Sequence, residues 1–433
     1  MQRYSFAGGI HPDYNKGKTS SKKIEKLPYE IGETLTIPIT QHLGAPSKEL
    51  VKKKDLVKIG DKIASASGLI SSSLHSPCSG EVEGVVLAPH PIMGNVPSIR
   101  IRINELSEDY TKLELTGSFQ DTVAEAGIVG LGGATFPSHV KLSPPKKVDY
   151  LIVNGVECEP FLTCDHRLML EYTEEILLGA ILIKEKLGIN ELIIGIEDNK
   201  MDAVESFQKL VGKYQFTLVP LHTKYPQGGE KQLIYATTGR VVPEGKLPLD
   251  VGVIVHNVGT CKAIFEAFSL HKPLYERVVT VTGAVKEPKN LLVKIGTPIS
   301  KLIEYCGGPV GDIEKIVIGG PMTGFAASSL DTPVMKGTGG VILFRKEDIN
   351  SGKKVNCVRC GRCVEACPMG LVPALMEQFS IQEQYEKLID WHVVNCIECG
   401  CCSYVCPSKR PLVGYFKTAK RQVINILRQR GKK

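Results

Sequence analysis

The chain has 433 residues, and its 42% hydrophobic and 23% charged residues are typical of a globular protein with roughly two to four domains. No apolar run reaches the roughly 18 residues of a membrane-spanning helix, and the N-terminus lacks the apolar stretch of a signal peptide. The net charge of +7 is modest and spread along the chain, which argues against nucleic acid as a partner. We therefore expect a cytoplasmic protein made of several folded units.

An all-β unit is predicted over residues 30–105, after an N-terminal extension at 1–29. Short strand-like segments there alternate with Gly-Asp and Ser-Gly turns. The stretch "VKIGDKIASASGLISSSLHSPCSGEVEGVV" resembles the barrel-sandwich domains that carry biotin or lipoate. Because "SASGLISSSLHSP" contains no lysine to modify, we expect a docking module and not a swinging carrier arm.

A glycine-rich segment opens the next unit, predicted over residues 115–275. In "GIVGLGGATFPSHVKL", the glycines Gly130, Gly132 and Gly133 precede Lys141. Such glycines let backbone N–H groups approach a phosphate or a ring, and a lysine adds positive charge. The same pattern also occurs in turns without a ligand, so by itself it leaves both interpretations open.

Strand-like and helix-like segments alternate through the rest of this unit, which predicts a doubly wound α/β domain. The first strand-like run, Tyr150–Val153, ends at Asn154, with Glu157 and Glu159 just beyond. Polar groups at the carboxyl end of a buried strand lie where open α/β sheets bind ligands. We therefore expect a ligand site at this edge of the sheet.

Two cysteine repeats near the end of the chain carry the most specific signal. "CVRCGRCVEACP" (357–368) and "CIECGCCSYVCP" (396–407) both read C-x2-C-x2-C-x3-C-P. In this run three thiolates bind one [4Fe-4S] cluster and the fourth reaches across to the other. Paired structural zinc sites are the alternative, but zinc gives no reason for the third cysteine or for either Cys-Pro ending.

The crossing rule divides the cysteines of the repeats into two sets and leaves Cys401 as a spare thiol. The first cluster is assigned to Cys357, Cys360, Cys363 and Cys406, and the second to Cys396, Cys399, Cys402 and Cys367. The segment between the repeats has apolar residues at helical spacing, so residues 350–412 are predicted to form a helical two-cluster ferredoxin domain. Residues 413–433 read as a basic amphipathic helix and tail, which could contact lipid or a partner subunit, or pack on the cluster domain.

The clusters raise the question of where electrons enter. Clusters pass single electrons, whereas NADH delivers a hydride, so a chain that starts from NADH needs a flavin to divide the electron pair. The chemistry is that of the cofactors, and the sequence predicts no catalytic acid or base.

With these segments in order, the sequence resembles the RnfC family of the Rnf electron-transport complex and, more distantly, the NADH-oxidising flavoprotein subunit of respiratory complex I. The Rnf resemblance extends from "GGIHP" through "GLGGATFPSHVKL", "NGVECEPFLTCDHRLM" and "YPQGGEKQLIYATTGR" to the cysteine repeats. The resemblance to the complex I subunit implies FMN in the α/β domain with NADH stacked on its ring. It also implies that residues 277–345 form a β-grasp, soluble-ligand-binding domain that supports the flavin domain without chemistry of its own.

The resemblance to the complex I subunit implies cofactor contacts at particular positions. The flavin loop would include Gly130, Gly132, Gly133, Phe136 and Lys141, and the remaining flavin and nucleotide contacts would come from Asn154, Glu157, Glu159, Gly229, Glu230, Asn257 and Thr260. Thr135 stands where the relative has a glycine, and Val156 where it has an aspartate. The two nucleotide-binding turns keep only part of their acidic residues, so recognition of adenine and ribose is expected to differ.

The resemblance implies a peripheral subunit on the cytoplasmic face of the cell membrane. It would exchange electrons between NADH, FMN and two [4Fe-4S] clusters within an ion-translocating ferredoxin:NAD oxidoreductase. Its partners would be the membrane and iron–sulfur subunits of the Rnf complex and, indirectly, ferredoxin. The alternatives are a related NADH-dependent reductase for another acceptor, such as a corrinoid, and an electron-transfer scaffold with clusters but no flavin or nucleotide.

Overall fold

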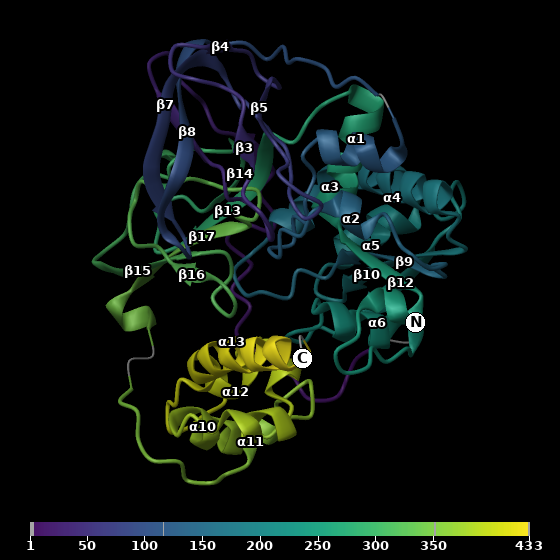
Figure 1. The fold of residues 1–433 in the computed structure, drawn as a ribbon, viewed down its shortest axis with the longest axis vertical. Coiled ribbons are helices and arrows are strands. Elements are labelled where there is room, and N and C mark those ends of the chain that lie inside the picture. Colours follow the sequence, from purple (N-terminus) through teal and green to yellow (C-terminus); the bar gives the residue numbers. More distant parts are fainter. Residues whose placement is uncertain (1–3, 116, 350–351, 432–433) are drawn as a thin grey trace.

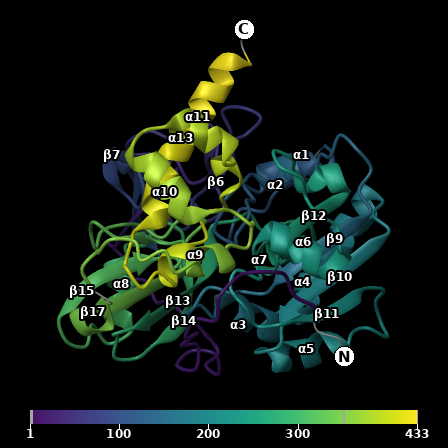
Figure 2. The same cartoon turned by 90° about the horizontal axis from the view of Figure 1, so that it is seen from below.

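The computed structural model describes residues 4–115, 117–349 and 352–431. The ends of the predicted domains at residues 1–3, 350–351 and 432–433 lie outside the described residues. Figures 1 and 2 show a β-rich region, an α/β region, a second β region and a separate group of C-terminal helices.

The N-terminal β region consists of two small antiparallel sheets. The first has the order β2-β8-β7-β4, with bounds Thr34–Pro38, Gly94–Glu105, Ser79–His90 and Leu56–Val57. The second has the order β3-β5-β6, with bounds Lys48–Glu49, Lys62–Ser65 and Leu74–His75. Alternating residues such as Leu35, Ile37, Ile99 and Ile101 point into a shared core, as expected for strands with one buried face. The long β7–β8 hairpin projects from this core toward the rest of the chain (Figure 1).

The α/β region is built on a parallel four-stranded sheet of order β11-β10-β9-β12. Its strands are β9 at Tyr150–Gly155, β10 at Glu191–Glu197, β11 at Thr217–Leu221 and β12 at Val253–Asn257. One face is covered by α3 (Cys164–Glu171), α4 (Thr173–Leu187), α5 (Met201–Gln208) and α7 (Val258–Phe265), and the other by α6 (Glu230–Thr238). The strand order reverses between β9 and β12, so their carboxyl ends form the crevice in which such sheets bind ligands.

Two short helices, α1 (Phe119–Glu125) and α2 (Ser138–Lys141), precede β9 and flank the glycine-rich segment. A π-helical turn at Glu266–Leu270 ends α7. A 3-10 turn at Pro248–Val251 leads into β12. Helices α1 and α2 therefore hold the glycine-rich segment between them.

The second β region is a mixed six-stranded sheet of order β1-β14-β13-β17-β15-β16. Its strands are β1 (Ile24–Lys26), β13 (Glu276–Gly283), β14 (Lys289–Lys294), β15 (Ile313–Ile318), β16 (Phe325–Ala326) and β17 (Gly340–Arg345). Helix α8 (Ile299–Tyr305) packs on it through Ile299, Leu302 and Ile303. Strand β1 comes from the N-terminal extension and pairs in parallel with β14, so that this extension is part of the sheet.

A buried lysine connects three of these regions. Lys336, which is 1% exposed, follows the β15–β16 hairpin, and its Nζ donates to the carbonyl oxygens of Ser73 at 2.7 Å and Gly127 at 2.6 Å. Burial lowers the pKa of Lys336 to about 7. The lysine fixes the N-terminal β region and the glycine-rich segment against the six-stranded sheet.

The C-terminal residues form a helical group with its own small core. Its helices are α9 (Arg362–Glu365), α10 (Pro373–Ile381), α11 (Tyr385–Asp390), α12 (Cys401–Tyr404) and α13 (Leu412–Arg430). Helix α13 buries Leu412, Phe416, Ala419 and Val423 against α10 and α11, and its basic C-terminal end projects outward (Figure 2). The first half of the predicted amphipathic helix is thus occupied by packing on the cluster domain.

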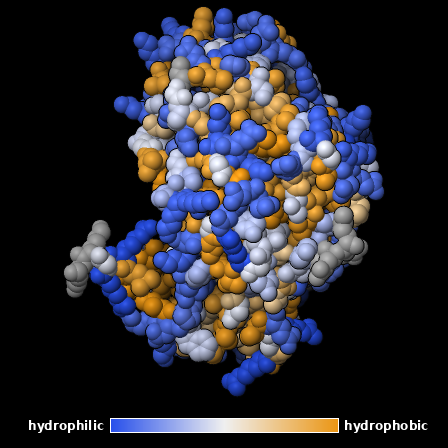
Figure 3. All heavy atoms as spheres, turned by 90° about the vertical axis from the view of Figure 1, so that its right-hand side faces the viewer, coloured by the Kyte–Doolittle hydropathy of each residue, from blue (hydrophilic) through white to orange (hydrophobic). Residues whose placement is uncertain are grey.

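Among the described residues, no helix has both the length and the apolar character needed to cross a membrane. On the face drawn in Figure 3, hydrophilic side chains are spread over the surface with hydrophobic ones between them.

Candidate functional site

A cavity of about 780 Å³ lies at the carboxyl ends of β9 and β12, within the size range of ligand pockets. The glycine-rich segment lines it from Leu131 to Thr135, together with Asn154 and Asn257 at the ends of the two strands. The segment after β9, including Glu157, Glu159 and Asp165, also lines it, and further walls come from outside the α/β region. They include residues 40–43 and 90–93 of the N-terminal β region, residues 318–320, 323–325, 335 and 337–339 of the second β region, and Ile397, Glu398 and Lys417 of the helical group.

The glycine-rich segment is a tight loop closed by its own backbone. The N–H of Gly130 donates to the Phe136 carbonyl at 2.9 Å, and the N–H of Thr135 donates to the Gly130 carbonyl at 3.1 Å. Gly133 has a φ of +104°, and a side chain there would be strained although no atom blocks it. Thr135, which replaces a glycine of the relative, also has a positive φ, of +49°.

Thr260 supports this loop from beneath. Its hydroxyl, fully buried, accepts a hydrogen bond from the Leu131 N–H at 3.0 Å. Thr260 therefore supports the loop that lines the cavity, but it does not line the cavity itself.

Asn154 and Asn257 hold the two strand ends in place. Asn154 donates to the Gly228 carbonyl at 2.9 Å and accepts from the Val156 N–H at 3.1 Å. Asn257 accepts from the Gly259 N–H at 2.8 Å, which caps α7, and its Nδ2 donates to Asp165 Oδ2 at 2.7 Å. Both amides face the cavity while their hydrogen bonds fix the crevice.

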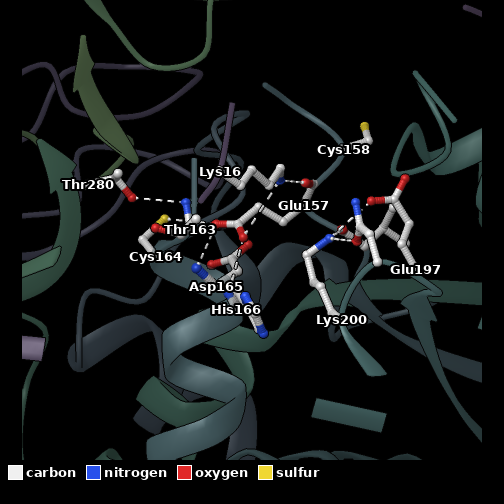
Figure 4. Close-up of polar contacts among 12 residues, drawn as sticks. Lys16, Glu157, Cys158, Thr163, Cys164, Asp165, His166, Glu197, Lys200 and Thr280 are labelled. Atoms are coloured by element: carbon white, nitrogen blue, oxygen red, sulfur yellow. Dashed lines mark hydrogen bonds and ion pairs between the residues drawn. The ribbon is translucent and has the colours of Figure 1, made fainter. Parts of the chain in front are cut away.

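Glu157 lies at the N-terminus of α3 (Figure 4). Its carboxylate accepts from the N–H groups of Asp165 at 2.8 Å and His166 at 3.2 Å, where the helix dipole favours a negative charge. Burial, followed by the charge of Glu157, raises the pKa of the neighbouring Asp165 to about 7. The cavity therefore contains a further carboxyl group that the sequence did not single out.

Glu159 connects the α/β region to the second β region. Its carboxylate accepts from the N–H groups of Met322 at 3.1 Å and Thr323 at 3.0 Å, and also from the Thr323 hydroxyl. Burial raises the pKa of Glu159. Glu159 thus holds a loop of the second β region at the cavity wall.

Six of the predicted site residues, all within the described part of the chain, do not line the cavity: Gly130, Phe136, Lys141, Gly229, Glu230 and Thr260. Lys141 pairs with Glu230, with 2.5 Å between Nζ and Oε1. The pair joins the helix after the glycine loop to the N-terminus of α6. A lysine from one predicted motif and a glutamate from another therefore neutralise each other in this structure.

The cavity is suited to a flavin nucleotide by its size, its glycine-lined edge and an unpartnered donor. Gln41 is 2% exposed and lines the cavity, and its Oε1 accepts from the Lys336 N–H at 2.9 Å. Its Nε2 has no partner within the described residues. A buried amide without an acceptor is costly, and an acceptor atom of a bound ligand would relieve that cost.

The cysteines assigned to the second cluster line one small, apolar cavity. The four assigned cysteines, Cys367, Cys396, Cys399 and Cys402, lie around it with the spare thiol Cys401 and with Met369, Leu371, Met376 and Phe416. Four sulfur donors around one apolar space are the donor set that a [4Fe-4S] cluster requires. The residues of this set come from both repeats, as the crossing rule requires.

The first set is more open. Cys357 and Cys360 are exposed, and Cys363 and Cys406 are partly buried. Burial, followed in smaller part by the charges of Cys357 and Cys360, raises the pKa of the Cys363 thiol, so these three sulfurs are neighbours.

The second set lies next to the large cavity. Ile397 and Glu398, between the predicted ligands Cys396 and Cys399, line the large cavity directly. Tyr225, 2% exposed, donates from its hydroxyl to the Cys399 carbonyl at 2.8 Å. The N-terminal segment reaches the residue next to this set, because the Gly9 N–H donates to the carbonyl of Ala366, which precedes Cys367, at 3.0 Å.

Sequence reasoning missed three groups of cavity residues. Asp165 stands inside the "NGVECEPFLTCDHRLM" motif, where its acidic side chain after a polar strand end was an available signal. Gln41 and the hairpin tip at 90–93 belong to a region interpreted as a docking module, and Glu398 lies inside a cysteine repeat. No local pattern indicated that these segments meet, because their proximity depends on how the regions pack together.

Family models match four consecutive parts of the chain. They are described as the RnfC barrel sandwich hybrid domain at residues 4–105, the Nuo51 FMN-binding domain at 123–266, the SLBB domain at 278–326 and the 4Fe-4S dicluster domain at 356–409. Together with the glycine-lined cavity and the grouped cysteines, they define the class as an iron–sulfur flavoprotein that transfers electrons.

The chain is similar to curated proteins from one kind of complex. It is 45% identical to the C subunit of the proton-translocating ferredoxin:NAD(+) oxidoreductase complex of Clostridium ljungdahlii, over 88% of this chain and 86% of the relative. It is 42% identical to the Na(+)-translocating counterpart of Acetobacterium woodii, over 97% of each chain. The chain belongs to the RnfC family of the Rnf complex, and this confirms the family predicted from its motifs.

Two solved structures share the fold. They are crystal structures of an NAD+-reducing [NiFe]-hydrogenase in the air-oxidized and H2-reduced states, with sequence identities of 18% and 19% and a TM-score of 0.50 for each. Each match covers 70% of this chain and 62% of the hydrogenase chain. At this identity the likeness concerns the fold alone.

Proposed function

We propose that the chain is the NADH-oxidising and NAD-reducing subunit of an ion-translocating ferredoxin:NAD oxidoreductase. The observation that carries the proposal is a single cavity shared by the glycine loop, the ends of β9 and β12, and the loop between two cluster ligands. A hydride acceptor in this cavity would lie beside the outlet for single electrons, as the conversion from pairs to single electrons requires.

FMN in this cavity would supply the exchange between hydride and single electrons. The backbone of Gly132 and Gly133 would approach it most closely, because neither residue has a side chain. Asn154, Asn257 and the Nε2 of Gln41 offer polar contacts. Glu157 and Glu159 hold the walls through backbone hydrogen bonds.

NADH is proposed to enter the same cavity from the side lined by the second β region and the hairpin tip. Ile92 and Met93 are 54% and 58% exposed and line the cavity there, so they offer apolar surface to a flat ring. Lys141 is proposed to serve a phosphate only if its pair with Glu230 opens on binding.

Two [4Fe-4S] clusters are proposed, with the ligand sets that the crossing rule gives. The set of Cys367, Cys396, Cys399 and Cys402 would receive electrons first, because its loop lines the large cavity. The set of Cys357, Cys360, Cys363 and Cys406 would pass them on, because it includes the exposed cysteines. The natural partners are then the other Rnf subunits at the cytoplasmic face of the membrane, and ferredoxin indirectly.

Reconstitution tests the proposal directly. The purified chain is loaded with iron, sulfide and FMN under anaerobic conditions and then mixed with NADH. We expect a bound flavin that NADH bleaches, followed by reduction of the clusters. Clusters without a bleachable flavin would contradict the proposal and favour the electron-transfer scaffold.

A glycine variant tests where the flavin is held. Gly133→Ala places a side chain at a φ of +104°, at a cost of about 1–2 kcal/mol to the loop, and should weaken FMN retention roughly 5- to 30-fold. Gly239→Ala is a matched control, since Gly239 has a φ of +71° and also has open space around it, but it ends α6 away from the cavity. FMN titration by fluorescence measures both variants, and equal affinity in the two would locate the flavin elsewhere.

A further inference from the structure

A second cavity, of about 720 Å³, lies beside the N-terminus of α3. Lys16 and His166 line it, and the exposed residues Asn199, Met201 and Asp202 form part of its rim. His166 Nε2 lies 2.7 Å from Asp202 Oδ1 at this rim. The second cavity is thus a polar, water-accessible space adjacent to the proposed flavin site.

Ionisable side chains connect the two cavities (Figure 4). Side-chain oxygen and sulfur atoms of Asp165, Glu157 and Cys164 lie within 4.8 Å of one another at the first cavity. Lys16 Nζ lies 4.0 Å from Glu157 Oε2 and donates a short hydrogen bond to the Glu157 carbonyl. Glu157 therefore stands between Asp165 on the flavin side and Lys16 on the second cavity.

The charges around Asp165 come from every element that packs against it. Glu157 precedes its helix, Cys164 and His166 flank it in the chain, and Asn257 from the end of β12 donates to it. The further charged groups near it are Lys16, Arg277, Lys262, Glu266, Lys272 and Glu276. Burial is the largest cause of the raised pKa of Asp165, and burial also lowers the pKa of Lys16. Shifts in these directions bring the pKa of the acid and the pKa of the base closer together, which lowers the free-energy cost of moving a proton between them.

We propose that Asp165 is a proton-exchanging residue of the flavin cavity, supplied from the second cavity through Lys16 and Glu157. This inference rests on the proposed function. A hydride moves two electrons and one proton from NADH to the acceptor, and once NAD+ leaves, the cavity has gained one negative charge. That charge favours protonation of a nearby carboxylate, so Asp165 binds one proton from solvent. When both electrons have left singly for the clusters, Asp165 returns this proton, and the proton that arrived with the hydride also leaves for solvent, so that each NADH releases one net proton.

Infrared spectroscopy of the flavin-free chain tests whether Asp165 titrates. We expect a carboxylic-acid C=O band that disappears as the pH rises through about 7, the value to which burial raises the Asp165 pKa. The band should be absent from Asp165→Asn and retained in Glu175→Gln, a control carboxyl on α4 whose pKa burial also raises. Labelling aspartate with carbon-13 assigns the band in the unmodified chain, so the test does not depend on a variant that folds. Absence of a titrating aspartate band would overturn the inference.

Proton uptake tests the coupling to reduction. The flavin-loaded protein receives one equivalent of NADH at about pH 8, one unit above the Asp165 pKa, in weak buffer with a pH indicator. We expect close to one proton bound per NADH in the wild type and in Glu175→Gln, and almost none in Asp165→Asn. Lys16→Arg keeps the charge and the hydrogen-bond donors but cannot release a proton, so it should bind the same number more slowly.

The outcomes separate the two proposals. If NADH bleaches the flavin of Asp165→Asn and the variant still binds one proton, Asp165 is not the proton-exchanging residue. If Lys16→Arg takes up its proton at the wild-type rate, the route through Lys16 is wrong. If NADH bleaches no flavin in the wild type, the proposed function fails, and the infrared result still reports on Asp165 alone.

Discussion

The two cysteine repeats have the same spacing, yet their surroundings differ. The set that includes Cys357 and Cys360 is largely open to solvent. The set that includes Cys399 and Cys402 lines an apolar space under α13 and lies next to the proposed flavin cavity. The motif specifies the ligand chemistry, whereas the packing of the domains decides which set faces inward. This difference is the basis for assigning an inner and an outer cluster.

Removing one ligand from each set should have the largest and most unequal effects. Cys402→Ser and Cys360→Ser should each lower the iron content by roughly half, because each removes one of two clusters. In Cys402→Ser, NADH should no longer reduce the remaining cluster, because the inner link is missing. In Cys360→Ser, the inner cluster should still be reduced by NADH while transfer to an external acceptor is lost.

Iron and sulfide analysis with electron paramagnetic resonance after NADH addition measures both effects. Cys401→Ser is the matched control, since Cys401 lies within the second repeat but is assigned to neither cluster. It should keep both clusters. If NADH reduced the remaining cluster in Cys402→Ser and not in Cys360→Ser, the order of the two clusters would be reversed.

Disrupting the contact between the N-terminal segment and the cysteines of the inner set should have a smaller effect, on the stability of the cluster domain. Gly8 has a φ of +76°, and a Cβ there would lie 2.7 Å from the Cys367 carbonyl oxygen. Gly8→Ala should therefore lower the free energy of unfolding of the cluster domain by about 3 kcal/mol. Gly370→Ala, with a φ of +66° and no neighbour within 4 Å, should cost only the backbone strain of about 1–2 kcal/mol.

Denaturant titration of the cluster-loaded protein, followed by cluster absorbance, compares these two glycine variants. Limited proteolysis adds a local measurement, because displacement of the N-terminal segment should expose it in Gly8→Ala only. Equal losses in the two variants would show that the contact with Cys367 contributes nothing to the inner set.

The same contrast explains what the sequence could predict. Cysteine spacing predicted two sets of cluster ligands, and the polar end of one strand, at Asn154, predicted the crevice, because both signals are local. Asn257, at the other side of the crevice, was predicted only from the family resemblance. The positions of Gln41, Asp165 and Glu398 depend on contacts between separate regions, which no spacing encodes. The partner of Lys141 was not predictable for the same reason. Its motif suggested a phosphate, but in the structure Lys141 pairs with Glu230 at the N-terminus of α6. The sequence therefore predicted the chemistry of single motifs, but it did not predict which residues from other regions contact them.

Substitution of Tyr225 should have the smallest effect, and it tests the surroundings of the inner cluster. Its hydroxyl donates to the Cys399 carbonyl at 2.8 Å, and Tyr225→Phe removes this bond with little change of shape. The loss of one buried hydrogen bond should lower stability by about 1 kcal/mol. It should also lower the reduction potential of the inner cluster, because a donor near a cluster ligand favours the more negatively charged reduced state.

A redox titration followed by electron paramagnetic resonance separates the two clusters in this variant. The outer cluster should keep its potential, since its ligands lie in the open part of the domain. Tyr404→Phe is the control, because Tyr404 is 51% exposed on α12, within the second repeat. A shift of both potentials in Tyr225→Phe would mean that the tyrosine acts on the whole helical group and not on the inner cluster alone. The distinction between an inner and an outer cluster would then rest only on the cysteine variants.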